Sequence, residues 1–483
     1  MKLLRPIILV QTFVLLLAAG IAIPSLLLAY FIDTTTLSAF LRVEVMSIGL
    51  ALVCFFLTRG ETFAVSSKQL YLITVTSWGT FALVGSIPLY MALPGLSFTD
   101  AFFESMSGIT TTGSTVLTGL DMMPLSVLLW RGILQWVGGI GIIVLGIAIL
   151  PFLRVGGMRL FATESSDWSG KSAPRAQTLI RNIGLIYITL TVIAALTYWG
   201  SGMGPFDAIV HAMTTLSTGG YANYDASMGY FKNSPMILWS ATLFMILGAL
   251  PFLLYSPLFQ GKVRPLIGDK QVRGFILFVL ALAVFLSVER TINGQIPFFQ
   301  ALTQVTFNLV SIITTTGYAS EDYTLWGDWA IVVFFYLMFV GGCSGSTAGS
   351  IKFFRFQIAL VMLRQQLHLM RHPGGVFISK YNDRVVTDDI IRSVIAFSFF
   401  FALTIAVIAL LLSLTGLDFV TSLSAATTAV TNVGPGLGNV VGPSGNFASL
   451  TETAKWTLCL GMLMGRLEIM TVLVLLTPTF WRT

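Results

Sequence analysis

Apolar runs long enough to cross a lipid bilayer follow one another along almost the whole chain. A hydrocarbon core of about 30 Å needs roughly 20 apolar residues in a helix, and these runs meet that length. Of the 483 residues, 55% are hydrophobic and only 10% are charged. The mean hydropathy of +0.86 is far too high for a soluble protein of this size. We therefore expect an all-α polytopic membrane protein.

The N-terminus begins like a signal peptide, because Lys2 and Arg5 precede an apolar run. That run continues for roughly 25 residues, however, and no clear small-residue cleavage site ends it. A retained first transmembrane helix is the better prediction. The three cysteines and three histidines follow no metal-ligand spacing, so neither a disulfide framework nor a histidine-rich metal site is expected.

Positive charge is distributed unevenly between alternate connections. Of the 27 Lys and Arg residues, 20 lie near the two ends and in the stretches 59–68, 154–181, 262–273 and 355–392. The connections between these stretches hold only Arg42, Arg131, Lys232, Arg290 and Lys455, and two more lie in apolar segments, Lys352 and Arg466. Because cytoplasmic connections retain Lys and Arg, both termini and the basic stretches are predicted to be cytoplasmic. This bias also explains the net charge of +6 without a nucleic-acid partner.

The remaining connections then face the outside. They carry eight of the 21 acidic residues: Asp100, Glu104, Asp121, Asp207, Asp225, Glu321, Asp322 and Asp328.

The pentapeptide Ile-Thr-Thr-Thr-Gly occurs twice, ending at Gly113 and at Gly317. Two related strings carry Gly220 and Gly434, so the four glycines lie 107, 97 and 117 residues apart. The residue thirteen positions before each glycine is polar: Asp100, Asp207, Gln304 and Thr421. Three of these, Asp100, Asp207 and Thr421, are plausible helix N-caps. The dozen residues between reach roughly 18 Å as a helix, too short to cross the membrane. Each is predicted to be a half-helix that enters from outside, turns at the glycine and returns as extended chain.

Two full-length apolar segments flank each half-helix, and two more precede the first repeat. The pairs are about 69–93 and 125–151, 177–201 and 234–258, 272–290 and 328–362, and 390–415 and 453–478, after 6–32 and 40–58. This arrangement predicts ten transmembrane helices and four re-entrant pore loops around one pore. The divisions are an N-terminal helical pair over 1–66 and four helix–pore loop–helix repeats over 67–160, 161–262, 263–382 and 383–483.

Non-helical backbone at membrane depth is tolerated only where it lines a water-filled cavity or is buried in protein. Four extended segments around one axis could replace the hydration shell of a monovalent cation with backbone carbonyls. Glycine permits the positive φ that such a strand needs, and the negative end of each half-helix dipole favours a cation. A helix C-cap would explain one such string but not four in register. The residues expected to form this selectivity filter are Thr110, Thr111, Thr112 and Gly113; Ser217, Thr218, Gly219 and Gly220; Thr314, Thr315, Thr316 and Gly317; and Thr431, Asn432, Val433 and Gly434.

Six strings together make the chain similar to one known family. They are FTDAFFESMSGITTTG (98–113), LQWVGGIGIIVL (134–145), FDAIVHAMTTLSTGGY (206–221), GGCSGSTAGSIK (341–352), TNVGPGLG (431–438) and GRLEIMTVLVLLTPTFWR (465–482). Through them the chain resembles the Trk/Ktr/HKT superfamily of potassium transport proteins, most closely the bacterial Trk-type membrane subunit. The resemblance covers nearly the whole chain.

The resemblance implies K⁺ uptake across the bacterial inner membrane, with K⁺ held at the filter residues. It also implies a homodimer, cytosolic nucleotide-binding regulatory subunits of the NAD or ATP type, and no intrinsic cofactor. In related plant proteins a serine at the first filter glycine accompanies Na⁺ transport, so glycine at 113 favours K⁺. Ser114 and Tyr221 depart from the common pattern, and we expect them to be neutral for ion choice. The stretch 366–390 is the longest soluble segment between helices and a candidate docking surface for the regulatory subunit.

Four glycines interrupt the second apolar segment of the third repeat, within 341–350. Each costs a helix roughly 1 kcal/mol relative to alanine, and the neighbouring Ser and Thr side chains can satisfy the freed backbone groups. The nucleotide pattern GxxxxGK[ST] is absent, and close packing of small residues between helices is the simpler alternative. The resemblance implies an intramembrane gate below the filter, formed by Gly342, Ser344, Gly345, Ser346, Thr347 and Gly349. We expect such a break in this repeat only.

Arg466 lies near the middle of the last apolar segment, where an arginine costs on the order of 2.5–3.5 kcal/mol. Glu468 points to another helical face and is not an obvious partner. An inter-helix ion pair is one explanation, whereas the resemblance implies a guanidinium that faces the pore against the glycine-rich loop. Lys352 is a weaker gate candidate that could extend to the cytoplasm. His211 is expected to be a packed polar group.

Other classes of function are disfavoured. A carrier with inverted repeats would have paired halves and a site at mid-membrane, whereas these four repeats share one orientation. An enzyme would need a catalytic cluster, and HExxH, GxSxG and paired intramembrane aspartates are absent from the sequence. Two alternatives stay open: an ion-coupled transporter (K⁺/H⁺ or K⁺/Na⁺ symport), and a less selective K⁺/Na⁺ pathway.

Overall fold

The structure is a computed structural model that describes residues 4–59, 66–148, 173–375, 379–382 and 384–482. Within these ranges seven helices are long and apolar enough to cross a membrane. They are α1 (Arg5–Phe31), α2 (Leu37–Thr58), α3 (Ser67–Ala92), α5 (Leu125–Ala148), α7 (Ala173–Gly200), α11 (Lys270–Gly294) and α15 (Asp388–Ser413). Two bent helix pairs raise the number to nine if each pair is one span. The chain is a helical membrane protein, as expected, but the described residues do not form ten unbroken spans.

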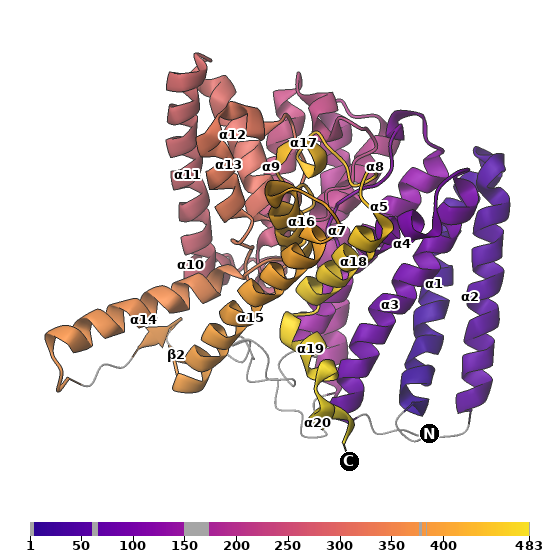
Figure 1. Ribbon diagram of the computed structural model, residues 1–483, viewed down its shortest axis with the longest axis horizontal. Helices are drawn as coiled ribbons and strands as arrows, with labels where there is room; N and C mark the ends of the chain where they lie inside the picture. Colours follow the sequence, from indigo (N-terminus) through magenta and orange to yellow (C-terminus); the bar gives the residue numbers. More distant parts are fainter. Residues whose placement is uncertain (1–3, 60–65, 149–172, 376–378, 383, 483) are drawn as a thin grey trace.

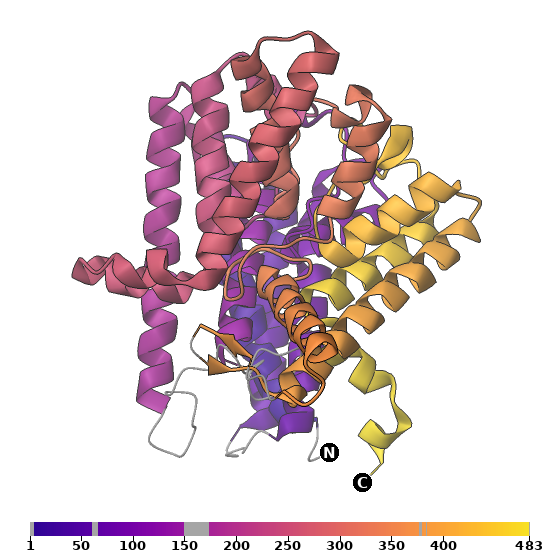
Figure 2. The same cartoon turned by 90° about the vertical axis from the view of Figure 1, so that its left-hand side faces the viewer.

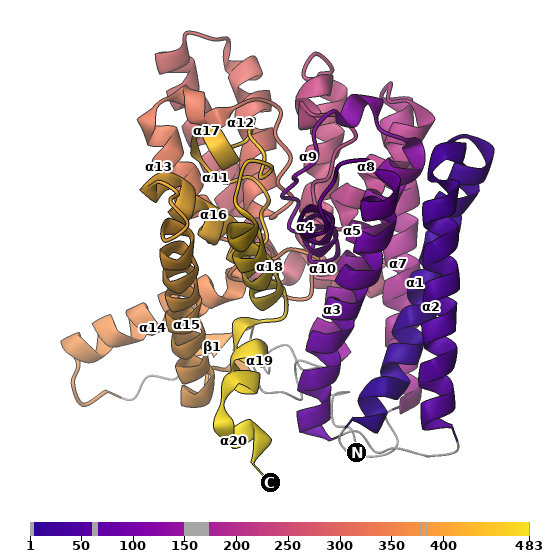
Figure 3. The ribbon, with the colours of Figure 1, turned by 45° about the vertical axis from the view of Figure 1, so that its right-hand side comes forward.

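Most of these helices run side by side (Figure 1). The N-terminal pair, α1 and α2, lies at one edge of the molecule beside α3, and α1 begins on the side where α20 (Pro478–Trp481) ends (Figure 3). The described ends of the chain therefore lie at the same end of the helical array, and their cytoplasmic orientation stays a prediction.

Four shorter helices stand at the positions expected of half-helices. They are α4 (Phe98–Ile109), α8 (Pro205–Leu216), α12 (Phe298–Ile313) and α16 (Phe419–Thr431). Each ends three or four residues before a repeat glycine, and its last turn is buried. The carbonyl ends of all four helices thus point to the segments that carry the glycines.

The helix N-caps lie elsewhere than the sequence analysis placed them. Ser97 Oγ accepts a hydrogen bond from the Asp100 N–H at 3.1 Å, and an Asp418 carboxylate oxygen accepts one from the Thr421 N–H at 3.1 Å. The assignment of Asp100, Asp207 and Thr421 as caps is therefore wrong. Asp100 and Asp207 are instead acidic residues of a first turn, where the helix dipole favours negative charge.

The second apolar segment bends in the second and fourth repeats as well as in the third. A bend of 101° separates α9 (Pro235–Ala249) from the 3₁₀ helix η6 (Phe252–Gln260), and one of 113° separates α18 (Glu452–Arg466) from α19 (Ile469–Leu473). The expectation of single helices over 234–258 and 453–478 is therefore wrong, although the glycine-rich break itself lies in the third repeat. Pro251 cannot donate a helical hydrogen bond at the first bend, and Glu468 has a left-handed φ of 60° at the second.

In the third repeat α13 (Asp328–Leu337) ends before the glycine-rich loop, and α14 (Phe353–Arg371) begins after it. Figure 1 shows α14 extending away from the rest of the molecule, with the short hairpin of β1 (Lys380–Tyr381) and β2 (Arg384–Val385) beside it, next to α15. Figure 2 shows the chain of η6 and α10 (Arg264–Gly268) lying across α7.

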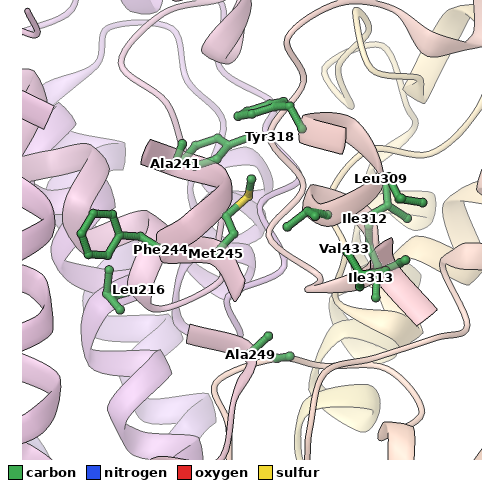
Figure 4. Close-up of a cluster of buried hydrophobic side chains, with 14 of the residues drawn as sticks. Leu216, Ala241, Phe244, Met245, Ala249, Leu309, Ile312, Ile313, Tyr318 and Val433 are labelled. Atoms are coloured by element: carbon green, nitrogen blue, oxygen red, sulfur yellow. The ribbon is translucent and has the colours of Figure 1, made fainter. Parts of the chain in front are cut away.

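Apolar side chains fix the buried ends of the short helices. Figure 4 shows one cluster, in which Leu216 of α8 and Ile313 of α12 accompany Phe244 and Met245 of α9. None of these side chains is more than 3% exposed. Val433, which follows α16, belongs to the same cluster, so the second, third and fourth repeats share one apolar core.

Candidate functional site

Each short helix is followed by a segment with the same backbone conformation. Two residues before the glycine the chain is left-handed, with φ between 50° and 58°, at Thr111, Thr218, Thr315 and Asn432. The glycines that follow have φ between 74° and 108°: Gly113, Gly220, Gly317 and Gly434. A threonine rarely adopts a left-handed φ, and backbone strain of this kind concentrates at functional sites. The same left-handed conformation recurs at a threonine in three repeats and at an asparagine in the fourth, so all four segments have one backbone conformation.

The four segments close into a ring. A Cβ atom placed on each repeat glycine would collide with a backbone carbonyl oxygen of the next segment: Gly113 with Gly219, Gly220 with Thr316, Gly317 with Val433, and Gly434 with Thr112. The last distance is 2.8 Å and the other three are shorter. A Cβ on Gly113 would also lie 3.7 Å from the Thr316 oxygen of the opposite segment. Only glycine therefore fits at these positions, and backbone oxygens surround each one.

Hydroxyl groups terminate the four half-helices. Three residues before each glycine, a side-chain hydroxyl donates to a carbonyl oxygen of the preceding turn. The bonds are Thr110 to Met106 (2.7 Å), Ser217 to Thr214 (3.2 Å), Thr314 to Val310 (2.7 Å) and Thr431 to Thr427 (2.8 Å). The Met106 and Val310 carbonyls also accept the backbone N–H of Thr110 and Thr314, so these hydroxyl bonds add to the last helical turn and keep the side-chain hydroxyl satisfied inside the protein.

On one side the ring opens into a cavity of about 530 Å³ that all four repeat glycines line. The connection after the fourth segment, which includes α17 (Gly438–Val441), forms much of the opposite wall. It is attached to the first segment through the Phe447 N–H, which donates to the Thr115 carbonyl at 2.9 Å. Among the described residues that line the cavity, Arg131 and Asp225 are the only charged ones.

Side chains of three half-helices hold the chain beyond the glycines. The acceptors are Glu104 for the Val116 N–H (3.0 Å), Asn308 for the Ser320 N–H (3.2 Å) and Ser424 for the Leu437 N–H (3.1 Å). Each of these N–H groups lies three residues past a repeat glycine. Glu104 and Asn308 lie nine residues before their glycines and Ser424 lies ten, and the three supports differ in chemistry, being a carboxylate, an amide and a hydroxyl.

His211 occupies the position of Glu104 and Asn308 in the second half-helix. Its side chain is fully buried, its Nδ1 lies 2.8 Å from the Asp207 carbonyl oxygen, and its ring packs against Tyr224 and Tyr318. This packing agrees with the expectation of a packed polar group. In the part of the chain that the structure describes, no group of His, Cys, Asp and Glu residues could hold a metal ion.

Gln135 of α5 is a contact residue of the ring that the sequence analysis missed. Its buried amide donates to the Gly219 carbonyl at 2.6 Å and accepts from the Tyr221 N–H at 2.9 Å. Gln135 therefore forms hydrogen bonds with the second segment at the residues before and after Gly220. The string 134–145 was noticed as part of the resemblance, but a single glutamine in it carried no signal of this contact.

Glycines of the second helices allow close packing on the half-helices. A Cβ on Gly248 would lie 3.0 Å from the Leu216 carbonyl oxygen at the end of α8. Gly138 approaches the Ile109 carbonyl and Gly465 the Val430 carbonyl in the same way. The second helices α5, α9 and α18 thus lie directly against the last turns of α4, α8 and α16.

Two residues that the charge pattern placed in outer connections are buried instead. Glu104 lies in α4 with no exposed surface, and Arg131 lies in α5 with 1% exposed. Their side chains form a salt bridge with Nε and Oε1 2.9 Å apart. Lys455, also assigned to a connection, lies in α18 and pairs with Asp100 at 2.5 Å. Counting charges along the sequence cannot tell a buried pair from two solvated residues.

Ser114 and Tyr221, expected to be neutral, both link segments. The Ser114 hydroxyl donates to the Gly434 carbonyl at 2.8 Å, which connects the first segment to the fourth. The Tyr221 hydroxyl donates to the Glu104 carbonyl at 2.7 Å, which connects the second segment to the first half-helix. Whether these contacts alter ion choice stays a prediction.

The glycine-rich loop lies against the ends of three half-helices. The Thr347 hydroxyl donates to the Leu216 carbonyl (3.1 Å) and the Gly248 carbonyl (2.9 Å), and the Gly349 N–H donates to the Thr315 hydroxyl at 2.7 Å. A Cβ on Gly349 would lie 2.6 Å from the Thr431 carbonyl oxygen. The remaining expected gate residues, Gly342, Ser344, Gly345 and Ser346, lie in the same loop, and the Gly345 carbonyl accepts from the Phe252 N–H at 3.0 Å.

Arg466 is buried and contacts this loop. Its Nη1 donates to the Thr347 carbonyl at 2.8 Å, and its Nη2 lies 3.5 Å from the Gly138 carbonyl of α5. It forms no salt bridge with any described residue. Glu468 pairs instead with Arg355 at 2.8 Å, and the Lys352 ammonium donates to the Ala348 carbonyl. A cavity of about 30 Å³ lies between the loop, Lys352, Arg466 and Glu468.

Membrane-length helices around a closed ring of glycines and backbone oxygens define an integral membrane protein of the ion-transport class. The chain belongs to the TrkH family of cation transport proteins, whose family model matches residues 37–482. This membership confirms the resemblance to the bacterial Trk-type membrane subunit.

Individual relatives match along almost their full length. The chain is 54% identical over 468 residues to the Trk system potassium uptake protein TrkI of Halomonas elongata, covering 97% of this chain and 95% of the relative. It is 36% identical over 474 residues to the Trk system potassium uptake protein TrkH of Salmonella typhimurium, with 97% of both covered. The crystal structure of the potassium transporter TrkH from Vibrio parahaemolyticus matches with a TM-score of 0.89 at 34% identity, covering 98% and 99% of the two chains.

Proposed function

We propose that this chain takes up K⁺ across the bacterial inner membrane through the ring of four segments. The relatives named above are potassium uptake proteins and share nearly its whole length. The single observation that carries the proposal is the closed order of contacts between each repeat glycine and a carbonyl oxygen of the next segment. Carbonyl oxygens can replace the hydration shell of a monovalent cation without a fixed charge in the ring.

Electrostatics supports the same assignment. The four half-helices end at the ring, so the negative ends of their dipoles are directed towards it. On this proposal the 16 filter residues named from the sequence line the path, and the wide cavity is its outer mouth. We also propose that the repeats divide at the predicted boundaries, of which the one between 160 and 161 lies outside the described residues, and that both termini are cytoplasmic.

The glycine-rich loop 341–350 is proposed to be the gate. The loop contacts Leu216 through Thr347, and it contacts Thr315 and the Thr431 carbonyl through Gly349. It therefore lies at the ends of three half-helices, on the side away from the wide cavity. Arg466 donates to its Thr347 carbonyl and adds a positive charge beside the path. A charged hydrogen bond of this kind contributes about 1.5–3 kcal/mol, which is enough to bias a loop towards a closed state.

Partners follow from the resemblance and are part of the proposal. We infer a homodimer and cytosolic nucleotide-binding subunits that act on the gate through the cytoplasmic surface. The stretch 366–390 begins in the last turns of α14, the helix that leads out of the gate loop, and ends in the first turn of α15. Crosslinks from a regulatory subunit that fall only elsewhere would refute this docking surface.

The proposal is tested by Gly113→Ser in cells that lack other K⁺ uptake systems. The serine side chain would collide with the Gly219 carbonyl of the second segment. We expect the initial rate of K⁺ uptake to fall at least about tenfold and the preference for K⁺ over Na⁺ to narrow, because misplaced carbonyls no longer match the dehydrated ion. Unchanged rates of both ions would exclude the ring as the filter.

A matched control is Gly119→Ser. Gly119 has a comparable φ of 73°, but nothing lies within 4 Å of a Cβ placed there. It carries the same backbone strain and should retain the ion preference of the parent protein. Uptake measured with the proton gradient collapsed, and again without Na⁺, separates a channel-like pathway from a symporter.

A further inference from the structure

The ion pair of Arg131 and Glu104 is the most highly connected polar contact beside the ring. Glu104 accepts hydrogen bonds from Arg131 Nε (2.9 Å), from the Thr115 hydroxyl (3.0 Å) and from the Val116 N–H (3.0 Å). All three donors are within reach of one carboxylate that has no exposed surface. The carboxylate therefore fixes the chain that leaves Gly113.

Arg131 extends this contact to the second segment. Its Nη1 donates to the Ala222 carbonyl at 2.9 Å, two residues past Gly220. Its guanidinium also lies over the Tyr221 ring, 4.1 Å from the centroid, and the Tyr221 hydroxyl returns to the Glu104 carbonyl. One side chain thus holds the first and second segments at a fixed separation, as the planar fork of arginine allows.

The pair exists in only one repeat. The residues nine positions before the other repeat glycines are His211, Asn308 and Ala425. None of these is a carboxylate, so the first repeat alone supports its segment with an ion pair. Arg131 also lines the wide cavity, where Asp225 is the only other charged residue among those described.

We infer that Glu104 and Arg131 are positioning residues that set the geometry and the charge of the outer cation site between the first two segments. This inference rests on the proposed function of the ring. Glu104 neutralises a guanidinium that would otherwise repel K⁺ at the mouth, and Arg131 neutralises a carboxylate that would otherwise hold the cation too strongly. The pair keeps the site neutral while its hydrogen bonds fix the width.

The test compares three variants of the full chain: Glu104→Gln, Arg131→Gln and the double substitution. K⁺ uptake is measured against concentration to obtain KM and kcat. Glu104→Gln leaves a positive charge and is expected to raise KM for K⁺ about threefold or more, whereas Arg131→Gln leaves a negative charge and is expected to lower it. The double variant carries neither charge, so its KM is expected to lie between those of the single variants.

A purely structural role predicts a different order. Both single variants would then raise KM, and the double variant would be the worst of the three, which would overturn the inference. If one single variant does not reach the membrane, the double variant is still expected to have a lower KM than Glu104→Gln or a higher KM than Arg131→Gln, whichever remains. Asp100→Asn is the matched control, because Asp100 lies in the same half-helix and pairs with Lys455 away from the ring. Its KM is expected to stay within about twofold of the parent protein.

The outcome separates this inference from the function it rests on. If Gly113→Ser alters the preference for K⁺ over Na⁺ while the three variants fail to follow the expected order, only the role of the ion pair is lost. If neither Gly113→Ser nor the pair variants alter K⁺ or Na⁺ transport, the filter assignment itself fails.

Discussion

The first and third segments have the same five residues and fold in the same way. Thr111 and Thr315 have φ of 53° and 58°, and Gly113 and Gly317 have φ of 87° and 81°. The hydroxyl pairs Thr110–Thr112 and Thr314–Thr316 are both 2.8 Å apart. The two copies of the Ile-Thr-Thr-Thr-Gly string therefore have the same local backbone conformation.

The surroundings of the two segments are nevertheless different. The first is supported by the carboxylate of Glu104 and the third by the amide of Asn308. The Thr315 hydroxyl accepts a hydrogen bond from Gly349 of the glycine-rich loop, whereas the Thr111 hydroxyl is buried with no partner among the described residues. The first and third segments thus share a backbone conformation but have different neighbouring side chains, and these neighbours come from other parts of the sequence.

The largest effect is expected from removing the contact that only the third repeat supplies. Deleting residues 344–348 takes away most of the loop beneath the third segment, so that its inner side becomes similar to that of the first. We expect basal K⁺ flux without any regulatory subunit to rise on the order of tenfold, since a closed state held by a charged hydrogen bond loses about 1.5–3 kcal/mol.

Arg466→Ala is expected to act in the same direction, because it removes the donor to the Thr347 carbonyl. Lys455→Ala is its control, since Lys455 is another buried basic residue of α18 but contacts Asp100 at the other end. Flux assays in proteoliposomes measure both variants. Basal flux unchanged by the deletion and by Arg466→Ala would remove the loop from the gate.

A smaller effect on basal flux is expected from substituting the equivalent threonines of the third and first segments. Thr315→Val removes the acceptor for the Gly349 N–H, whereas Thr111→Val removes a hydroxyl that makes no contact with the loop. Both substitutions disturb the ring, but only Thr315→Val should shift the closed state, by roughly 1 kcal/mol or about fivefold in the ratio of basal to stimulated flux. Equal ratios in the two variants would show that the loop is not coupled to the third segment.

The smallest effect concerns the outer ends of the half-helices. Hydrogen bonds from the Thr421 N–H and hydroxyl lower the pKa of the exposed Asp418 carboxyl, which caps α16. Asp418→Ala should therefore lower the free energy of unfolding by about 0.5–1 kcal/mol at neutral pH. This is the low end of the usual cost of losing an N-cap, because water screens the exposed carboxylate.

The sign of the pH dependence follows from that lowered pKa. The stabilisation by Asp418 is complete above the ordinary carboxyl pKa and is lost as the pH falls through the lower native value. The difference in Tm between Asp418→Ala and the parent protein should therefore shrink in acid. Ser97→Ala removes a neutral cap from α4, so its difference in Tm should not change with pH. A difference for Asp418→Ala that grows in acid would contradict the assignment.

The sequence was sufficient to locate the glycines, because a Cβ at these positive-φ positions would collide with a backbone carbonyl oxygen of the next segment. It also located the half-helices, since an apolar run of a dozen residues after a polar one cannot cross a bilayer. It did not locate Gln135 or the Glu104–Arg131 pair, because single polar residues in apolar helices have no periodic signal. It missed the bend at Pro251, although a proline lacks the N–H of a helical hydrogen bond, and it missed the bend at Glu468, whose left-handed φ of 60° is not indicated by its residue type. The N-caps were displaced by three residues because Asp is favoured both at a cap and in the first turn.

The central claim is that K⁺ passes through the ring of four glycines. Crystals of the protein soaked in Tl⁺, which replaces K⁺ and scatters anomalously, test it most directly. We expect anomalous peaks inside the ring, between Gly113, Gly220, Gly317 and Gly434, that are lost when Na⁺ replaces Tl⁺ and that are weakened in Gly113→Ser. Tl⁺ peaks that lie only outside the ring, or that persist unchanged in Gly113→Ser, would contradict the claim.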